Sequence, residues 1–125
     1  MIAAAISNES PSVLLVEPSA ETREVLSTIL QLRGLRIFEA EEPRRGLQLA
    51  REERPDVIVL DFEQYALDDH LQDEFAAETR HRHGGLIVLG NTPPERPASL
   101  NRFVAKPFHY APLVQKIERL VGKAA

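Results

Sequence analysis

The segment PDVIVLD, residues 55–61, decides the fold, because a short β-branched run stands between a proline and an acid. Apolar runs of this length are typical of strands that are buried on both faces of a parallel sheet. Two further runs, residues 13–16 and 86–89, have the same length and character. The three runs therefore predict the centre of a parallel sheet.

Helical patterns fill the intervals between the strand patterns and follow the last one. Their caps and breakers are Ser19, Gly34, Pro43 and Pro55. A third helix is expected to end near residues 84–85, and a last one carries an apolar face over residues 113–121. An alternating strand pattern at residues 35–39 and a short strand pattern at residues 103–105 suit sheet edges. The alternation predicts an α/β fold with a five-stranded parallel sheet and helices on both faces.

The crossover between Gly90 and Phe103 is unusual. It contains only twelve residues, of which three are proline. Proline interrupts helices, and so few residues leave room for one or two turns at most. We expect the fourth helix to be shortened or lost. The surface that it would have covered is a candidate partner site.

Length and composition limit the possible functions. With 125 residues and a net charge of −4, the chain predicts one domain, residues 12–125, after a flexible tail, residues 1–11. The absence of cysteine excludes thiol catalysis and thiolate metal centres, and it fits a cytoplasmic location. Apolar runs of four residues are too short to cross a membrane. The acidic balance argues against direct binding of nucleic acid.

Three polar residues follow predicted strands directly. Glu17 and Asp61 each end an apolar run, and Lys106 ends the last strand. Ligands of open α/β sheets bind beyond the carboxyl ends of the strands, where these side chains would meet. Two neighbouring carboxylates need a compensating cation, which is either a divalent metal ion or Lys106.

Through these residues the chain resembles the receiver domains of two-component response regulators. The resemblance runs from about residue 13 to residue 121 and rests on VLLVE (13–17), PDVIVLD (55–61) and FVAKPF (103–108). It implies the flavodoxin-like strand order 2-1-3-4-5.

The resemblance also implies roles for single residues. Asp61 would accept a phosphoryl group from a histidine kinase or a phosphotransfer protein. Glu17, Asp61 and the backbone carbonyl of Glu63 would hold Mg²⁺, and Lys106 would pair with the phosphoryl group. A cis peptide bond is expected before Pro107. The chain would then be a signalling domain and not an enzyme, and it would act on an effector domain or another protein partner.

The chain departs from the family pattern at several positions. Pro18 stands where the family has its second acid, which predicts weak Mg²⁺ binding. Gly90 stands where the family has a hydroxyl residue that contacts the phosphoryl group, and Phe103 takes the place of the aromatic switch residue. The loop at residues 62–69 lacks the usual Pro-Gly. These departures predict an atypical receiver with an altered switch.

Two other functions were weighed against a phosphorylatable receiver. A pseudo-receiver would keep the fold and dock protein partners without phosphorylation. A flavin or nucleotide binder would need glycine in its first strand-to-helix turn, but residues 17–20 contain none. No spacing of serine, histidine and aspartate indicates a hydrolase.

Overall fold

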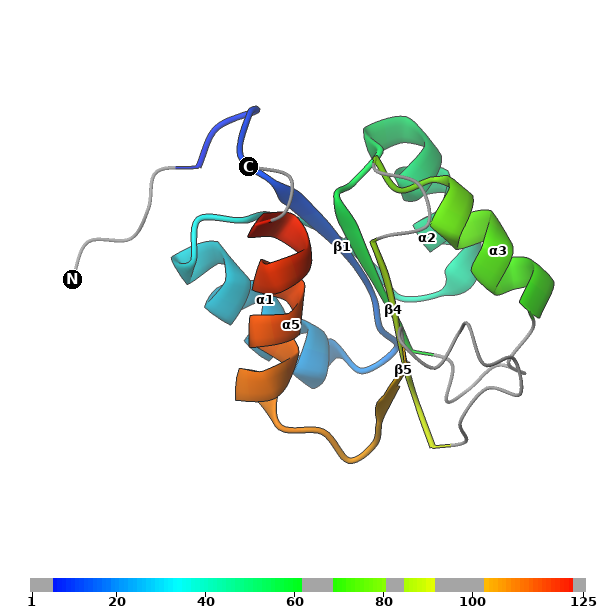
Figure 1. The fold of residues 1–125 in the computed structure, drawn as a ribbon. Helices are drawn as coiled ribbons and strands as arrows, with labels where there is room; N and C mark the ends of the chain where they lie inside the picture. Colours follow the sequence, from blue (N-terminus) through cyan, green and yellow to red (C-terminus); the bar gives the residue numbers. More distant parts are fainter. Residues whose placement is uncertain (1–5, 62–68, 81–84, 92–102, 123–125) are drawn as a thin grey trace.

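The computed structural model describes residues 6–61, 69–80, 85–91 and 103–122 (Figure 1). The strands are β1 (Ser12–Val16), β2 (Arg36–Ala40), β3 (Val57–Asp61), β4 (Leu86–Gly90) and β5 (Phe103–Ala105). The helices are α1 (Ala20–Leu32), α2 (Pro43–Glu53), α3 (Asp69–Ala77) and α5 (Tyr110–Gly122).

The strands form one parallel sheet in the order β2-β1-β3-β4-β5. The three apolar runs are its central strands, and each is buried along its whole length. The two less apolar strands, β2 and β5, are its edges. The predicted α/β class, the strand order and the edge positions are therefore confirmed.

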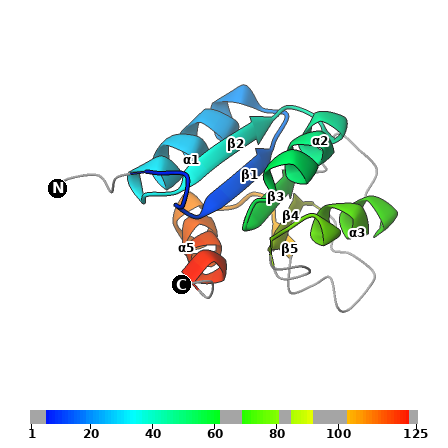
Figure 2. The same cartoon turned by 90° about the horizontal axis from the view of Figure 1, so that it is seen from above.

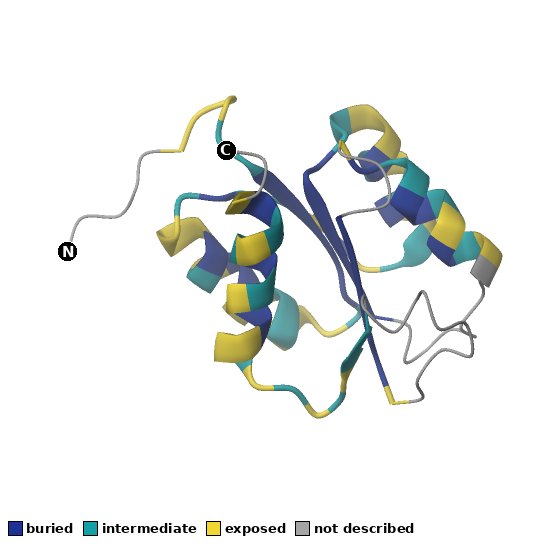
Figure 3. Ribbon diagram, viewed as in Figure 1, coloured by how far each residue is buried: buried dark blue, intermediate teal, exposed yellow. Residues whose placement is uncertain are grey.

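Helices cover both faces of the sheet. In Figures 1 and 2, α1 and α5 lie on one side, and α2 and α3 lie on the other. Because side chains alternate along a strand, each central strand supplies both cores. Leu15 and Val59 pack with α1 and α5, whereas Leu14 and Ile58 pack with α2 and α3. Figure 3 shows these strands buried and the outward faces of the helices exposed.

Two helix ends differ in how well the sequence predicted them. Ser19 caps α1 as expected, and its hydroxyl accepts a hydrogen bond from the Thr22 amide at 3.3 Å. The prediction that the third helix ends near residues 84–85 is wrong, because α3 ends at Ala77. The Thr79 hydroxyl donates to the Ala76 carbonyl at 3.0 Å, and the Arg80 amide donates to Pro55 at 2.8 Å. These bonds turn the chain back towards the sheet.

Some expectations lie outside the described residues. They include the shortened fourth helix within residues 92–102 and most of the loop at 62–69. The boundary between the tail and the domain stays a prediction. No helix in the described part of the chain is long and apolar enough to cross a membrane.

Candidate functional site

The three polar residues that were predicted to meet at the carboxyl edge of the sheet do lie together. Glu17 follows β1, Asp61 is the last residue of β3, and Lys106 follows β5. Asp61 Oδ2 accepts a hydrogen bond from Lys106 Nζ, and only 2% of the Asp61 side chain and 13% of the Lys106 side chain are exposed. The sheet therefore holds a buried carboxylate in direct contact with an ammonium group.

The β5 edge aligns Lys106 with this site. Its backbone amide donates to the Gly90 carbonyl at 2.9 Å, which continues the ladder in which Gly90 pairs with Ala105. The Lys106–Pro107 peptide bond is cis, as the resemblance to receiver domains implied.

Glu17 is the second buried carboxyl of the site, with 5% of the residue exposed. Its Oε1 accepts a hydrogen bond from the Ser19 amide at 3.3 Å, whereas Oε2 is buried and has no partner within the described residues. Burial raises the pKa of Glu17 from its ordinary 4.5 to about 8, and the adjacent Asp61 adds to the rise. Lys106 and the Ser19 amide act in the opposite direction. Burial therefore favours the protonated form of Glu17 and shifts its titration towards neutral pH.

A proton on Glu17 accounts for the buried Oε2 atom that has no other hydrogen-bond partner within the described residues. Two carboxylates have only acceptors, so they cannot hydrogen-bond to each other unless one is protonated. With a proton on Glu17, the two carboxyl groups can share a hydrogen bond, in which Glu17 donates to Asp61. A divalent cation between the carboxylates would meet the same need.

The donor set fits Mg²⁺ in part. Carboxylate oxygens are suitable ligands for this hard cation, which keeps several waters when it is bound by one or two carboxylates. Within residues 6–61, 69–80, 85–91 and 103–122, no three histidine, cysteine or acidic side chains form a metal-binding group. Glu17 and Asp61 are thus the two carboxylates offered by the described chain. The expected backbone ligand, Glu63, lies outside the described residues.

The two expected switch positions contact each other. Gly90 is buried at the end of β4, and the half-buried Phe103 ring packs against the α2 and α3 core. A Cβ atom added to Gly90 would lie 3.3 Å from Phe103 Cε1. The phenyl ring therefore occupies the space beside the strand where a larger residue at Gly90 would place its side chain.

This contact predicts a small loss of stability in Gly90→Ser. The added Cβ would push the Phe103 ring by a few tenths of an ångström, and mild overpacking of this kind costs about 1 kcal/mol. Urea unfolding would measure the loss. In a Phe103→Leu background the ring edge is gone, so we expect the loss to fall within the additivity error of about 0.5 kcal/mol. An equal loss in both backgrounds would assign the effect to the strand itself.

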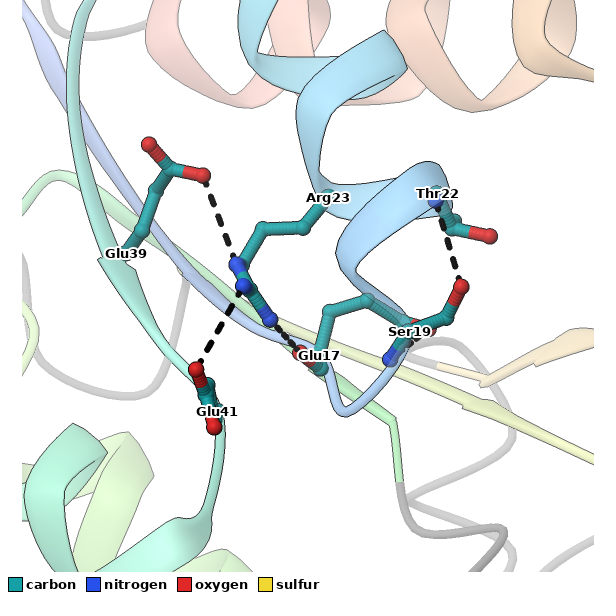
Figure 4. A network of polar contacts seen from close by, with 6 residues as sticks. All are labelled: Glu17, Ser19, Thr22, Arg23, Glu39 and Glu41. Atoms are coloured by element: carbon teal, nitrogen blue, oxygen red, sulfur yellow. Dashed lines mark hydrogen bonds and ion pairs between the residues drawn. The ribbon is translucent and has the colours of Figure 1, made fainter.

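Sequence reasoning missed Arg23. This residue of α1 has a side chain that is 14% exposed, and its Nη1 donates to the backbone carbonyl of Glu17 at 2.6 Å (Figure 4). Its Nε lies 3.5 Å from Glu39 Oε1, and its Nη2 lies 3.8 Å from Glu41 Oε1. The available signal was an arginine near the start of a helix, where the helix dipole disfavours a cation.

Comparisons with known proteins give a consistent result. No protein-family model matches the sequence. The KDP operon transcriptional regulatory protein KdpE of Escherichia coli strain K12 is 45% identical over 51 residues, which are 41% of this chain and 23% of that relative. The matched segment thus spans under a quarter of the relative.

Solved structures match over nearly the whole chain. The receiver domain of the Francisella response regulator 1452 has a TM-score of 0.74 and 18% identity, covering 93% of this chain and all of its own. The receiver domain of sensor histidine kinase PA1611 from Pseudomonas aeruginosa PAO1 has a TM-score of 0.60 and 22% identity, covering 90% of this chain and 98% of its own. That structure has a magnesium ion coordinated in its active site cleft. At these identities the comparisons establish the fold.

Proposed function

This chain has the fold of a response regulator receiver domain, and from this premise we propose that it is a signalling domain that accepts a phosphoryl group on Asp61. The donor is a histidine kinase or a phosphotransfer protein, and the output passes to an effector domain or a separate protein partner. One observation carries the proposal: a buried aspartate contacts a lysine at the carboxyl edge of the sheet, beside a second buried carboxyl, that of Glu17.

The residues divide the reaction between them. An Asp61 carboxylate oxygen attacks the phosphorus of a phosphohistidine, the P–N bond breaks, and its electron pair returns to the imidazole, which takes up a proton. Lys106 stays beside the acyl phosphate and offsets its charge. Glu17, Asp61 and the Glu63 carbonyl would hold Mg²⁺, which neutralises charge on the transferring oxygens.

The proposal includes a weak Mg²⁺ site. Pro18 supplies no carboxylate, and Glu17 must give up its proton before it can bind the ion. Mg²⁺ affinity is therefore expected to rise with pH until the pH passes about 8, the pKa of Glu17.

A pseudo-receiver that docks partners without phosphorylation is the second candidate. Two observations favour it. Lys106 already contacts the Asp61 carboxylate directly, and the Phe103 ring lies in the space beside Gly90. Under this proposal the site is a buried polar contact that stabilises the rim of the sheet.

A titration followed by amide NMR separates the two functions. Mg²⁺ and then beryllofluoride, an acyl phosphate mimic, are added at pH 8 to the wild type and to Asp61→Asn. For a phosphorylatable receiver we expect saturable shifts at Glu17, Asp61 and Lys106 that are abolished in the variant, because Asn lacks the anionic oxygen. Asp73→Asn makes the same chemical change at an exposed position of α3 and should respond as the wild type does. Unmoved amides in the wild type would instead support the docking module.

A further inference from the structure

The main chain of Glu17 is held on both sides of its Cα atom. Its amide donates to the Ala40 carbonyl of β2 at 3.0 Å, and its carbonyl accepts from Arg23 Nη1 at 2.6 Å. Fixing both flanking peptide planes fixes the direction of the Cα–Cβ bond. The two hydrogen bonds therefore fix the direction in which the Glu17 side chain leaves the main chain.

Arg23 supplies the hydrogen bond to the Glu17 carbonyl, which the sheet does not provide. The Ala40 bond continues the β1–β2 ladder, but the Glu17 carbonyl stands beyond the last pair of that ladder, Val16 with Ala40. The next residue, Pro18, has no amide hydrogen and contributes no donor to the turn. The guanidinium therefore supplies the hydrogen bond to the Glu17 carbonyl, and it adds to the Ser19 amide bond that holds the Glu17 side chain.

The surroundings of Arg23 orient it for this contact. The guanidinium lies between the turn and the acids Glu39 and Glu41, as Figure 4 shows. The planar fork of arginine can serve several acceptors at once in fixed directions. The two acids, whose side chains are 43% and 79% exposed, hold two of its nitrogens while the third reaches the Glu17 carbonyl.

We propose that Arg23 is a positioning residue, which clamps the Glu17 main chain so that the carboxyl faces Asp61 and thereby sets the Mg²⁺ affinity of the site. The metal-binding part of this inference rests on the proposed function. The clamp on the main chain stands on its own geometry.

Arg23→Met gives a test in which geometry and charge predict opposite signs. Methionine keeps an unbranched aliphatic stem but lacks the guanidinium, and the acids that it leaves behind are exposed enough to be hydrated. Removing a positive charge near a cation site would by Coulomb's law tighten Mg²⁺ binding. Loss of the clamp would weaken it, and losing the groups that orient a metal ligand typically costs about 10-fold to 100-fold in affinity. We expect the dissociation constant of Mg²⁺, followed by amide NMR at pH 8, to rise at least about 10-fold.

A second measurement needs no metal. In EDTA, the ¹⁵N order parameters of the Glu17 and Ser19 amides should fall in Arg23→Met from a rigid value of about 0.85 towards about 0.6. Arg33→Met is the matched control, because it removes an exposed Arg33–Glu118 ion pair at the other end of α1. It should change neither the order parameters nor the Mg²⁺ affinity.

The outcomes separate this inference from the proposed function. Tighter or unchanged Mg²⁺ binding in Arg23→Met, with rigid amides, would overturn the clamp and leave the Mg²⁺ site standing. Looser amides in a protein whose wild type binds no Mg²⁺ would support the clamp and remove the proposed metal site. Weaker binding with looser amides would support both.

Discussion

Replacing Lys106 with methionine is expected to lower the free energy of unfolding by about 3 kcal/mol at pH 8 in the absence of Mg²⁺. The Asp61 side chain is 2% exposed, and the ammonium group of Lys106 contacts it directly. Removing one partner of a buried ion pair leaves the other charge, here the Asp61 carboxylate, buried without compensation. We expect a loss at the lower end of the usual range because 13% of the Lys106 side chain is exposed.

A double-mutant cycle in urea would measure the pair. Asp61→Asn removes the carboxylate charge, so Lys106→Met should cost much less in that background than in the wild type. If Lys106→Met lowers the free energy of unfolding by less than about 1 kcal/mol, which is the contribution of an exposed ion pair, then Asp61 is hydrated in solution and does not form a buried ion pair with Lys106.

The second large effect is a loss of stability as the pH rises, caused by Glu17. Its pKa is about 8 in the folded chain against an ordinary 4.5. Between these pH values the folded state keeps a proton that the unfolded state releases. Because the unfolded state binds fewer protons, the free energy of unfolding decreases as the pH rises. The Glu17 contribution is fully present below pH 4.5 and is lost by about pH 8. At about 1.4 kcal/mol for each pH unit, the loss is at most about 5 kcal/mol.

Glu17→Gln isolates this contribution from other titrating groups. Glutamine resembles the protonated carboxyl and does not ionise, so the variant should gain stability relative to the wild type between pH 5 and pH 8. Urea unfolding in EDTA at four pH values would show the divergence. Parallel pH profiles for the two proteins would contradict the raised pKa. In saturating Mg²⁺ the wild type should recover stability at pH 8, and Glu17→Gln should recover less.

Much of the sheet could be predicted from the sequence because its determinants are local. An apolar run that is rich in β-branched residues is typical of a strand buried on both faces, and the residue that ends a parallel strand lies at the carboxyl edge of the sheet. These two rules place Glu17, Asp61 and Lys106 together from the sequence alone. The resemblance to receiver domains added the strand order and the roles.

The remaining features depend on neighbours that are distant in sequence. The ion pairs of Arg23 form because β2 and the turn after it bring Glu39 and Glu41 alongside α1. The Gly90–Phe103 contact depends on the register of β4 with β5, in which Phe103 pairs with Val88. The end of α3 depends on a bond from Arg80 to Pro55. No periodicity encodes such contacts, and the raised pKa of Glu17 likewise follows from burial in the assembled fold.

The short edge strand β5 affects how long the contact between Lys106 and Asp61 persists. β5 has three residues, and Lys106 follows the last of them. Edge segments held by few hydrogen bonds open at a lower free energy than the central strands, so β5 can detach and re-form while the other strands remain paired. Each opening event withdraws the ammonium group from Asp61, and each closing event returns it. We therefore expect the residence time of the charge pair to follow the opening of this three-residue strand and not the unfolding of the central strands.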